Sequence, residues 1–238
     1  YISIEVPPTI AKDTESTVSE AIRYYTAISR ENLMIKIPGT PEGLPAVSRV
    51  ISEGINVNVT LLFSVESYIN TAWAYIEGLE ARAAKGEGIN KIASVASFFL
   101  SRIDSNIDGI IDSKLKNIAD ETVKAKLEAV KGKVAIANAK IAYQEYKKII
   151  QGDRWKALSA KGAKVQRLLW ASTSTKNPAY SDVMYVDELI GPNTVNTLPP
   201  QTIDACPDHC HVDNRVETKI EAAKEVMENL KDSEININ

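Results

Sequence analysis

The chain has 238 residues, of which 44% are hydrophobic and 25% charged, and its formal net charge is -3. This composition is typical of one globular domain with a substantial core, and the small net charge suggests neither nucleic acid nor an anionic membrane as a bulk partner. No apolar stretch approaches the roughly 20 residues that span a bilayer, and the sequence opens on a strand pattern rather than a signal peptide. Two cysteines in a chain of this size favour a reducing compartment.

The first predicted strand covers residues 1–6, where apolar and polar side chains alternate. Ile2 and Ile4 share one face of this strand, and Ser3 and Glu5 share the other. Glu5 is either a solvated residue at the strand end or a general acid or base. Asp13 is a predicted helix N-cap.

A strand, helix and strand follow between residues 33 and 63. The run 33–38, LMIKIP, reads as a strand with Lys36 near its end, and the run 55–63 reads as the next strand. Thr40 is the predicted N-cap of the helix between them, and Gly54 ends that helix. Short connections of this kind predict a parallel βαβ unit.

The second of these strands has one polar face. Its alternation predicts that Asn58 and Thr60 share that face, while the opposite, apolar face holds Val57, Val59, Leu61 and Phe63. Polar side chains on one face of a parallel sheet are not expected in a purely apolar core, so this face should line an interior that contains a site. A (β/α) barrel provides one, because its active site lies at the C-terminal ends of the strands.

Lys36 has two interpretations. A lysine at a strand end often extends its ammonium group into solvent. Burial among Met34, Ile35 and Ile37 would instead favour the neutral amine, which attacks a carbonyl to form an imine.

Two later segments carry candidate phosphate ligands. Arg102 follows the predicted strand 92–99 and either forks onto a phosphate or pairs with Asp104 at the surface. Residues 107–161 are predicted to be a helical insertion whose lysines form a solvated face. After the predicted strand 165–173, the loop from Ser172 to Lys176 offers hydroxyl groups and one cation.

The remaining chain is predicted to hold a short strand at 194–198, closed by a Pro-Pro pair, and an amphipathic helix over 213–230 before a polar tail at 232–238. The segment 206–211, CPDHCH, contains zinc ligand types. A structural zinc site usually combines two separated ligand pairs, so we expect a loop without metal here.

Several strings resemble the transaldolase family of class I aldolase-type enzymes: MIKIPGTPEG, GINVNVTLLFS, VASFFLSRID and LLWASTSTKNPAYSD. The resemblance runs from residue 1 to about residue 200 and implies an α/β fold, the transaldolase-type TIM (β/α)8 barrel. It implies that Lys36 forms the imine, that Glu5 relays protons through a water beside Thr60, and that Asn58 lines the site. The residues it implies for substrate and phosphate binding are Ser97, Arg102, Ser172 and Lys176.

The resemblance also implies the reaction, which is transfer of a dihydroxyacetone unit in the non-oxidative pentose phosphate pathway. The donor is a ketose phosphate, sedoheptulose 7-phosphate or fructose 6-phosphate, and the acceptor is an aldose phosphate, glyceraldehyde 3-phosphate or erythrose 4-phosphate. No metal or organic cofactor is expected, because the protonated imine is the electron sink. The expected location is the cytoplasm or a plastid, and a homo-oligomer is a further expectation.

Six strands are predicted, whereas eight close this barrel. We therefore expect residues 1–238 to form a single barrel domain with strands three to eight, shortened at the N-terminus. The family's first-strand catalytic aspartate then has no counterpart here. A related aldolase that releases the three-carbon unit, and a catalytically impaired remnant that depends on a partner, are the alternatives.

Overall fold

The computed structural model describes residues 1–235 and 237, so positions 236 and 238 of the predicted polar tail lie outside the described residues. The chain folds into two compact units. Unit 1 comprises Tyr1–Leu62, Glu66–Ser97 and Glu145–Leu168, and unit 2 comprises Phe63–Val65, Phe98–Gln144 and Leu169–Asn238.

The described residues contain one six-stranded sheet whose strands are hydrogen-bonded in chain order, β1-β2-β3-β4-β5-β6. The first three strands pair in parallel, as predicted. The six strands occupy Ile2–Glu5 (β1), Leu33–Pro38 (β2), Asn56–Leu62 (β3), Ser94–Phe99 (β4), Arg167–Ala171 (β5) and Thr194–Asn196 (β6). All six predicted strands are therefore confirmed, with ends that move inward by at most two residues.

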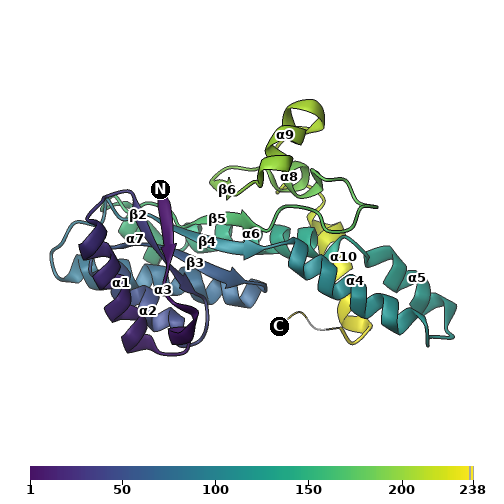
Figure 1. Cartoon of the computed structure of the whole chain (residues 1–238), viewed down its shortest axis with the longest axis horizontal. Coiled ribbons are helices and arrows are strands. Elements are labelled where there is room, and N and C mark those ends of the chain that lie inside the picture. Colours follow the sequence, from purple (N-terminus) through teal and green to yellow (C-terminus); the bar gives the residue numbers. More distant parts are fainter. Residues whose placement is uncertain (236, 238) are drawn as a thin grey trace. The chain divides into compact units, whose positions relative to one another are not determined.

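Unit 1 alternates its strands with helices (Figure 1). These are the short 3-10 helix η1 (Pro8–Ile10), α1 (Thr14–Ile28), α2 (Gly43–Ser52), α3 (Val65–Ala84) and α7 (Asp153–Ser159). Asp13 caps α1 by accepting the Ser16 amide at 3.0 Å, and the Thr40 hydroxyl accepts the Gly43 amide at 3.0 Å before α2. The predicted cap at Asp13 is confirmed, whereas the N-cap position of α2 is Glu42 rather than Thr40, whose hydroxyl binds the first amide of that helix from three residues earlier.

One glycine lets α3 approach α2 closely. A Cβ atom at Gly78 would lie 2.6 Å from the Ser48 carbonyl oxygen and 2.7 Å from Ile51 Cβ. Only glycine accommodates such an approach without moving the helices apart. The contact presses the buried face of α2, which includes Val47, Val50 and Ile51, between α3 and the sheet.

The alternation predicted for β3 fails at its end. Leu61 was expected on the buried apolar face, but it is 40% exposed and has a left-handed backbone with φ of 62°. Leu62 is fully buried instead and packs beside Gly39. The positive φ rotates the chain by one position, so the strict two-residue period ends at Thr60.

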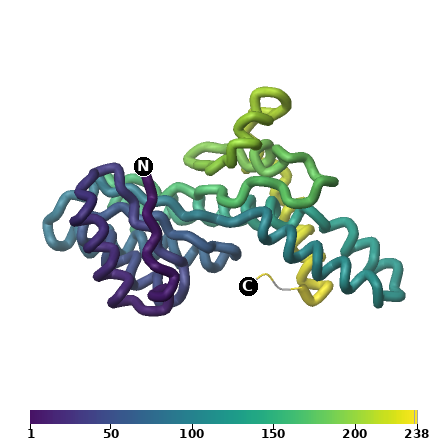
Figure 2. Tube along the Cα trace, viewed as in Figure 1, coloured from purple at the N-terminus to yellow at the C-terminus, as the bar shows by residue number. Residues whose placement is uncertain are grey.

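Unit 2 is mainly helical, and Figure 2 follows its trace. Its helices are α4 (Ser101–Leu115), α5 (Glu121–Val130), the first part of α6 (Val134–Gln151), α8 (Met184–Leu189), α9 (Pro200–His209) and α10 (Ile220–Asp232). The α5 helix packs against both α4 and α10. Helix α9 corrects the prediction of a loop at 206–211, because Pro200 occupies an N-terminal helical position that tolerates proline rather than closing the preceding strand.

Two acidic residues of α4 connect the elements of unit 2. Asp104 accepts hydrogen bonds from the Ala135 amide and the Tyr185 hydroxyl at 2.8 and 2.7 Å. Asp108 accepts the Gly132 amide at 3.0 Å and the Tyr180 hydroxyl at 2.7 Å. The two carboxylates therefore tie the start of α6 and the region of α8 to α4.

The lysines of the helical segment are not all solvated. Lys140 is 2% exposed and forms an ion pair with Glu188 at 2.8 Å, and it donates to the Thr218 carbonyl at 3.2 Å. The prediction of a wholly solvated lysine face was therefore wrong at Lys140. Its buried ammonium group is instead paired with the Glu188 carboxylate of α8.

Within residues 1–235 and 237, none of the helices combines the length and the apolar character needed to cross a membrane.

Candidate functional site

Lys36 and Glu5 face each other on neighbouring parallel strands. The β1–β2 register places Glu5 opposite Lys36, and Lys36 Nζ lies 3.2 Å from Glu5 Oε2. The side chains are 28% and 45% exposed, so both remain accessible. An amine beside a carboxylate, open to a ligand, is a pair that can exchange protons with a bound carbonyl compound.

A chain of hydrogen bonds runs beside this pair on the same face. Asn58 Nδ2 donates to Ser3 Oγ at 3.0 Å, and Ser97 Oγ donates to Asn58 Oδ1 at 2.7 Å. Asn58 and Ser97 are 7% and 2% exposed. The bonds fix the amide of Asn58, which is opposite Lys36 in the β2–β3 register. Ser3 was not singled out from sequence, although its position two residues before Glu5 placed it on the same face.

Thr60 lies on the same face of β3 as Asn58, opposite Pro38 in the strand register. Its side chain is fully buried, and its hydroxyl oxygen has no hydrogen-bond partner among the described residues. A buried hydroxyl without a partner is uncommon, and such groups usually bind an ordered water or a ligand. The Thr60 hydroxyl is therefore a buried polar group on the face of Asn58 that no described residue satisfies.

The environment of Lys36 differs in one respect from the prediction. Ile35 and Ile37 are fully buried, but alternation along the strand places them on the face opposite Lys36. Met34, at 3% exposed, is the apolar neighbour on the lysine's own face. The surroundings of the amine are accordingly polar as well as apolar.

The candidate phosphate ligands belong to unit 2. Arg102 is exposed in the first turn of α4, and its guanidinium lies 4.9 Å from the centre of the Phe99 ring. Asp104 is buried and accepts hydrogen bonds from the Ala135 amide and the Tyr185 hydroxyl. It therefore does not form the surface ion pair with Arg102 that was the alternative prediction. The Arg102 guanidinium thus packs on the Phe99 ring and is exposed to solvent.

Ser172 is held at the end of β5 next to the start of α4. Its hydroxyl lies 2.9 Å from the Ser101 hydroxyl, and its carbonyl accepts the Ser101 amide at 3.1 Å. Its backbone is left-handed, with φ of 58°, a conformation that non-glycine residues adopt mainly under local constraint. Ser101, which was not predicted from the sequence, therefore joins Ser172 to the residue before Arg102.

Lys176 lies exposed in the loop after Ser172. The loop is ordered by the Thr175 hydroxyl, which donates to the Ser181 carbonyl at 2.8 Å. Ser172 is thus linked to Ser101, the residue before Arg102, and Lys176 follows Ser172 in the loop.

The family model described as "Transaldolase/Fructose-6-phosphate aldolase" matches residues 1–238, the whole chain. The chain belongs to this family. Among its relatives, a protein named transaldolase from Trichodesmium erythraeum is 92% identical over 238 residues, all of this chain and 63% of the relative. A Nostoc protein named transaldolase 2 is 73% identical over 100% of this chain and 62% of its own length. A transaldolase from Saccharopolyspora erythraea is 48% identical over 99% of this chain and 62% of its own length.

This transaldolase-family chain therefore spans less than two thirds of the length of these relatives. Its α/β architecture, with six strands of the barrel fold in the described residues, agrees with the predicted fold class. The Lys36 and Glu5 pair lies on β2 and β1 of this family member.

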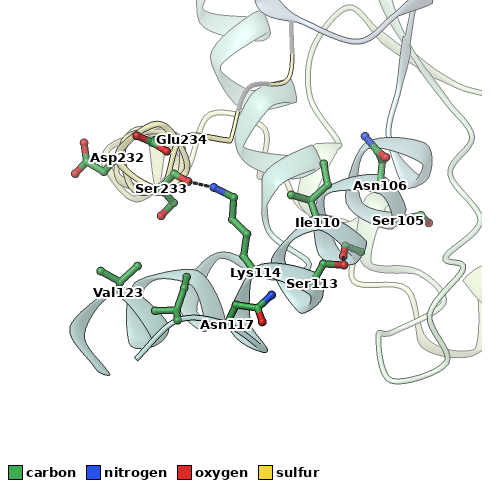
Figure 3. A pocket seen from close by; sticks show the side chains of 12 residues that line it. Ser105, Asn106, Ile110, Ser113, Lys114, Asn117, Val123, Asp232, Ser233 and Glu234 are labelled. Carbon is green, nitrogen blue, oxygen red and sulfur yellow. Dashed lines mark hydrogen bonds between the residues drawn. The ribbon is translucent and has the colours of Figure 1, made fainter. Parts of the chain in front are cut away.

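Two cavities of the described structure lie away from the predicted residues. One of about 800 Å³ is lined by α4, α5 and the end of α10, where Lys114 donates to the Ser233 carbonyl at 2.8 Å (Figure 3). The other, of about 580 Å³, opens at the N-terminal ends of the first strands in unit 1. Neither is lined by a predicted site residue. No cluster of three or more His, Cys, Asp or Glu residues suited to a metal ion occurs in the described part of the chain.

Proposed function

We propose that the protein is a transaldolase, which transfers a dihydroxyacetone unit from a ketose phosphate to an aldose phosphate by way of an imine on Lys36. The donors would be sedoheptulose 7-phosphate or fructose 6-phosphate, and the acceptors glyceraldehyde 3-phosphate or erythrose 4-phosphate. The observation that carries the proposal is the 3.2 Å approach of the Lys36 amine to the Glu5 carboxylate on adjacent strands. The names of relatives up to 92% identical support it.

The reaction begins when the neutral Lys36 amine attacks the C2 ketone of the donor. The carbinolamine loses water, and Glu5, acting through a water held by the Thr60 hydroxyl, supplies and removes the protons. In the protonated imine, the C4 hydroxyl gives its proton to Glu5 through the same water, the bond between C3 and C4 breaks to leave an aldehyde at C4, and the electrons of that bond pass into an enamine on Lys36. The released aldose phosphate leaves, the enamine adds to the acceptor aldehyde, and water then hydrolyses the new imine.

Asn58 would orient the hydroxyl groups of the substrate, because its amide is already fixed between Ser3 and Ser97. Arg102, Ser172 and Lys176 would bind the phosphate. Arginine suits this task because its planar guanidinium donates two parallel hydrogen bonds to phosphate oxygens. The resemblance implies that a first-strand aspartate of the family helps to break the carbon–carbon bond, and no residue among these 238 corresponds to it.

The remaining proposals concern the whole protein. We propose that residues 1–238 form one barrel domain with a helical insertion over about 107–161, that the protein works in the cytoplasm, that it assembles as a homo-oligomer and that it needs no cofactor. Its partners would be sugar phosphates of the non-oxidative pentose phosphate pathway.

A transfer assay tests the proposed function against the related aldolase activity. The chain is supplied with fructose 6-phosphate and erythrose 4-phosphate, and products are quantified by mass spectrometry. Transaldolase activity yields sedoheptulose 7-phosphate and glyceraldehyde 3-phosphate in equal amounts with no free dihydroxyacetone. Accumulation of dihydroxyacetone without sedoheptulose 7-phosphate would instead establish an aldolase.

Replacing Glu5 with glutamine is expected to lower the rate of imine formation about 100-fold, because general acid-base catalysis contributes on this order. The amide keeps the size of the side chain but cannot take up a proton. The rate is measured from pre-steady-state trapping of the adduct. Glu15→Gln is the matched control, since Glu15 is an exposed residue of α1 that forms an ion pair with Arg49 of α2. Equal rates for Glu5→Gln and the unmodified chain would contradict the assigned role.

Replacing Arg102 with methionine is expected to raise KM for fructose 6-phosphate about 10- to 100-fold, the range for a lost charge-assisted hydrogen bond. The value of kcat should change little, because the phosphate lies away from the reacting carbons. Unphosphorylated fructose serves as the comparison and should show the same kcat/KM with both proteins. A parallel loss with both substrates would show that Arg102 acts on the fold rather than on phosphate.

The second candidate function is that of a catalytically impaired remnant that folds with a partner. One observation favours it, which is the exposure of Ile2 at 68% on β1, the first strand in the sheet order, and of the preceding Tyr1 at 60%. An exposed apolar edge strand invites association. Aggregation, or loss of near-ultraviolet circular dichroism with retained helicity, would support this candidate. A folded chain active in the transfer assay would exclude it.

A further inference from the structure

Cys206 and Cys210 lie one helical turn apart at the end of α9. The Cys210 amide donates to the Cys206 carbonyl at 3.0 Å, which closes the last turn of the helix. Residues four apart lie on the same face of a helix. Both cysteines are free thiols of intermediate exposure. The two sulfur atoms therefore share one partly accessible surface.

The Cys210 thiol also has a charged neighbour, Asp187. Burial, followed by hydrogen bonds with the Cys206 thiol and the Asp187 carboxylate, raises the pKa of the Cys210 thiol to about 12. Asp187 accepts the His211 amide at 2.9 Å, so its carboxylate is fixed beside the turn. Cys210 consequently stays a thiol near neutral pH and reacts slowly on its own.

The end of α9 can change shape at low cost. Pro207 within the helix has no amide hydrogen, so one bond of the helical ladder is missing. Cys210 is the C-cap and has an extended backbone, with ψ of 140°, rather than a helical one. Cβ atoms four residues apart in a helix are about 5 to 6 Å apart, whereas a disulfide needs about 3.5 to 4.5 Å. A closure of about 1 to 2 Å must therefore be taken up where α9 is weakest.

We propose that Cys206 and Cys210 form a reversible intrachain disulfide, which makes the end of α9 a redox-sensitive site. A peroxide is the oxidant. The Cys206 thiolate attacks one oxygen of hydrogen peroxide and becomes a sulfenic acid while hydroxide leaves. The Cys210 sulfur then attacks the Cys206 sulfur, the S–O bond breaks, and the Cys210 proton passes to the departing oxygen. Two thiols and one peroxide give one disulfide and two waters.

The bond is expected to be readily reduced, because a disulfide closed against helical geometry stores strain and has a more oxidising potential. Within residues 1–235 and 237, the structure contains no group of three or more His, Cys, Asp or Glu residues that could hold a metal ion.

Oxidation is expected to change the conformation of the loop that carries Ser172 and Lys176. His209, next to Cys210, has its Nε2 2.8 Å from Asp182 Oδ1, and Asp182 lies at the end of that loop. Figure 1 draws α9 beside α8, in agreement with this contact. Closing the disulfide shifts the turn that holds His209, and so loosens the loop 172–183. This consequence does not depend on the proposed transaldolase activity.

The test uses the full chain with hydrogen peroxide in slight excess, followed by alkylation of free thiols and peptide mass spectrometry. We expect both cysteines to escape alkylation, a mass loss of two hydrogens in the peptide that contains them, and full recovery with dithiothreitol. Hydrogen exchange should show uptake in residues 172–183 rising at least twofold on oxidation. The reduced Cys206→Ser chain should alkylate at Cys210 at least tenfold more slowly than the Cys210→Ser chain alkylates at Cys206.

The Cys210→Ser variant provides the matched control, because it should accumulate a sulfenic acid at Cys206 and show no change in exchange. Disulfide-linked dimers, separate oxidation of each cysteine, or a disulfide that forms only in denaturant would each overturn the proposal. A disulfide that forms without any change in the loop 172–183 would overturn the link to that loop.

Discussion

Replacing Lys36 with arginine is expected to lower transfer activity about 1,000-fold or more, to the background of the assay. Arginine keeps the positive charge beside Glu5 but its guanidinium is always protonated and cannot attack a ketone. Loss of a covalent nucleophile removes an entire reaction path rather than one contact, which is why the effect is large. Steady-state transfer between fructose 6-phosphate and erythrose 4-phosphate measures it.

The control for this substitution is Lys91→Arg. Lys91 is a surface lysine of unit 1 whose side chain is 79% exposed, and it pairs only with the exposed Glu31 among the described residues. Its replacement should leave activity within about twofold and stability within about 0.5 kcal/mol, as for other surface substitutions. Activity of Lys36→Arg within tenfold of the unmodified chain would show that another amine forms the imine.

The buried carboxylate of Asp104 is expected to make unit 2 less stable as the pH rises through 6. Burial raises the pKa of this carboxyl to about 6, and the neighbouring Asp108 adds to the rise, against the opposing hydrogen bonds from Ala135 and Tyr185. A higher pKa in the folded state means that folding favours the protonated form. The contribution is therefore fully present below about pH 4 and is lost as the pH rises to 6 and above.

Asp104 is expected to change the free energy of unfolding by about 3 kcal/mol in total, because its pKa values in the folded and unfolded states differ by about two units. About 2 kcal/mol of this change occurs between about pH 4.5 and 7.5. In Asp104→Asn the dependence should vanish, because the amide does not titrate while its oxygen still accepts the Ala135 amide. The free energy of unfolding, from urea denaturation of both proteins across this range, gives the difference. Asp112→Asn, an exposed residue of the same helix that pairs with Lys131, is the control. Parallel curves for Asp104→Asn and the unmodified chain would contradict the prediction.

The strands and the central pair could be predicted because their signals are local. The run 33–38 ends at a proline, and strand alternation alone placed Glu5 with Ser3 and Asn58 with Thr60. Short connections implied parallel neighbours, and parallel neighbours in register bring Glu5 to Lys36. The resemblance to transaldolases supplied the roles, and the family match agrees with it.

Features set by distant contacts could not be read in the same way. The left-handed backbone of Leu61 breaks an alternation that the sequence continues, because Leu62 fills the space beside Gly39. The donors to Asp104 come from positions 31 and 81 residues away, and the partner of Lys140 lies 48 residues away. Helix α9 was missed because Pro-Pro usually ends a strand but also begins a helix.

Borohydride trapping with fructose 6-phosphate, followed by peptide mass spectrometry, tests the assignment of Lys36 most directly. Reduction fixes any imine as a stable amine, so the mass and position of the adduct report both the nucleophile and the extent of carbon-carbon cleavage. We predict a three-carbon adduct on Lys36. An intact six-carbon adduct would mean that the imine forms without cleavage, which contradicts transfer by these residues alone. A demonstrably folded chain that carries no adduct on Lys36 would contradict the proposed role of this lysine.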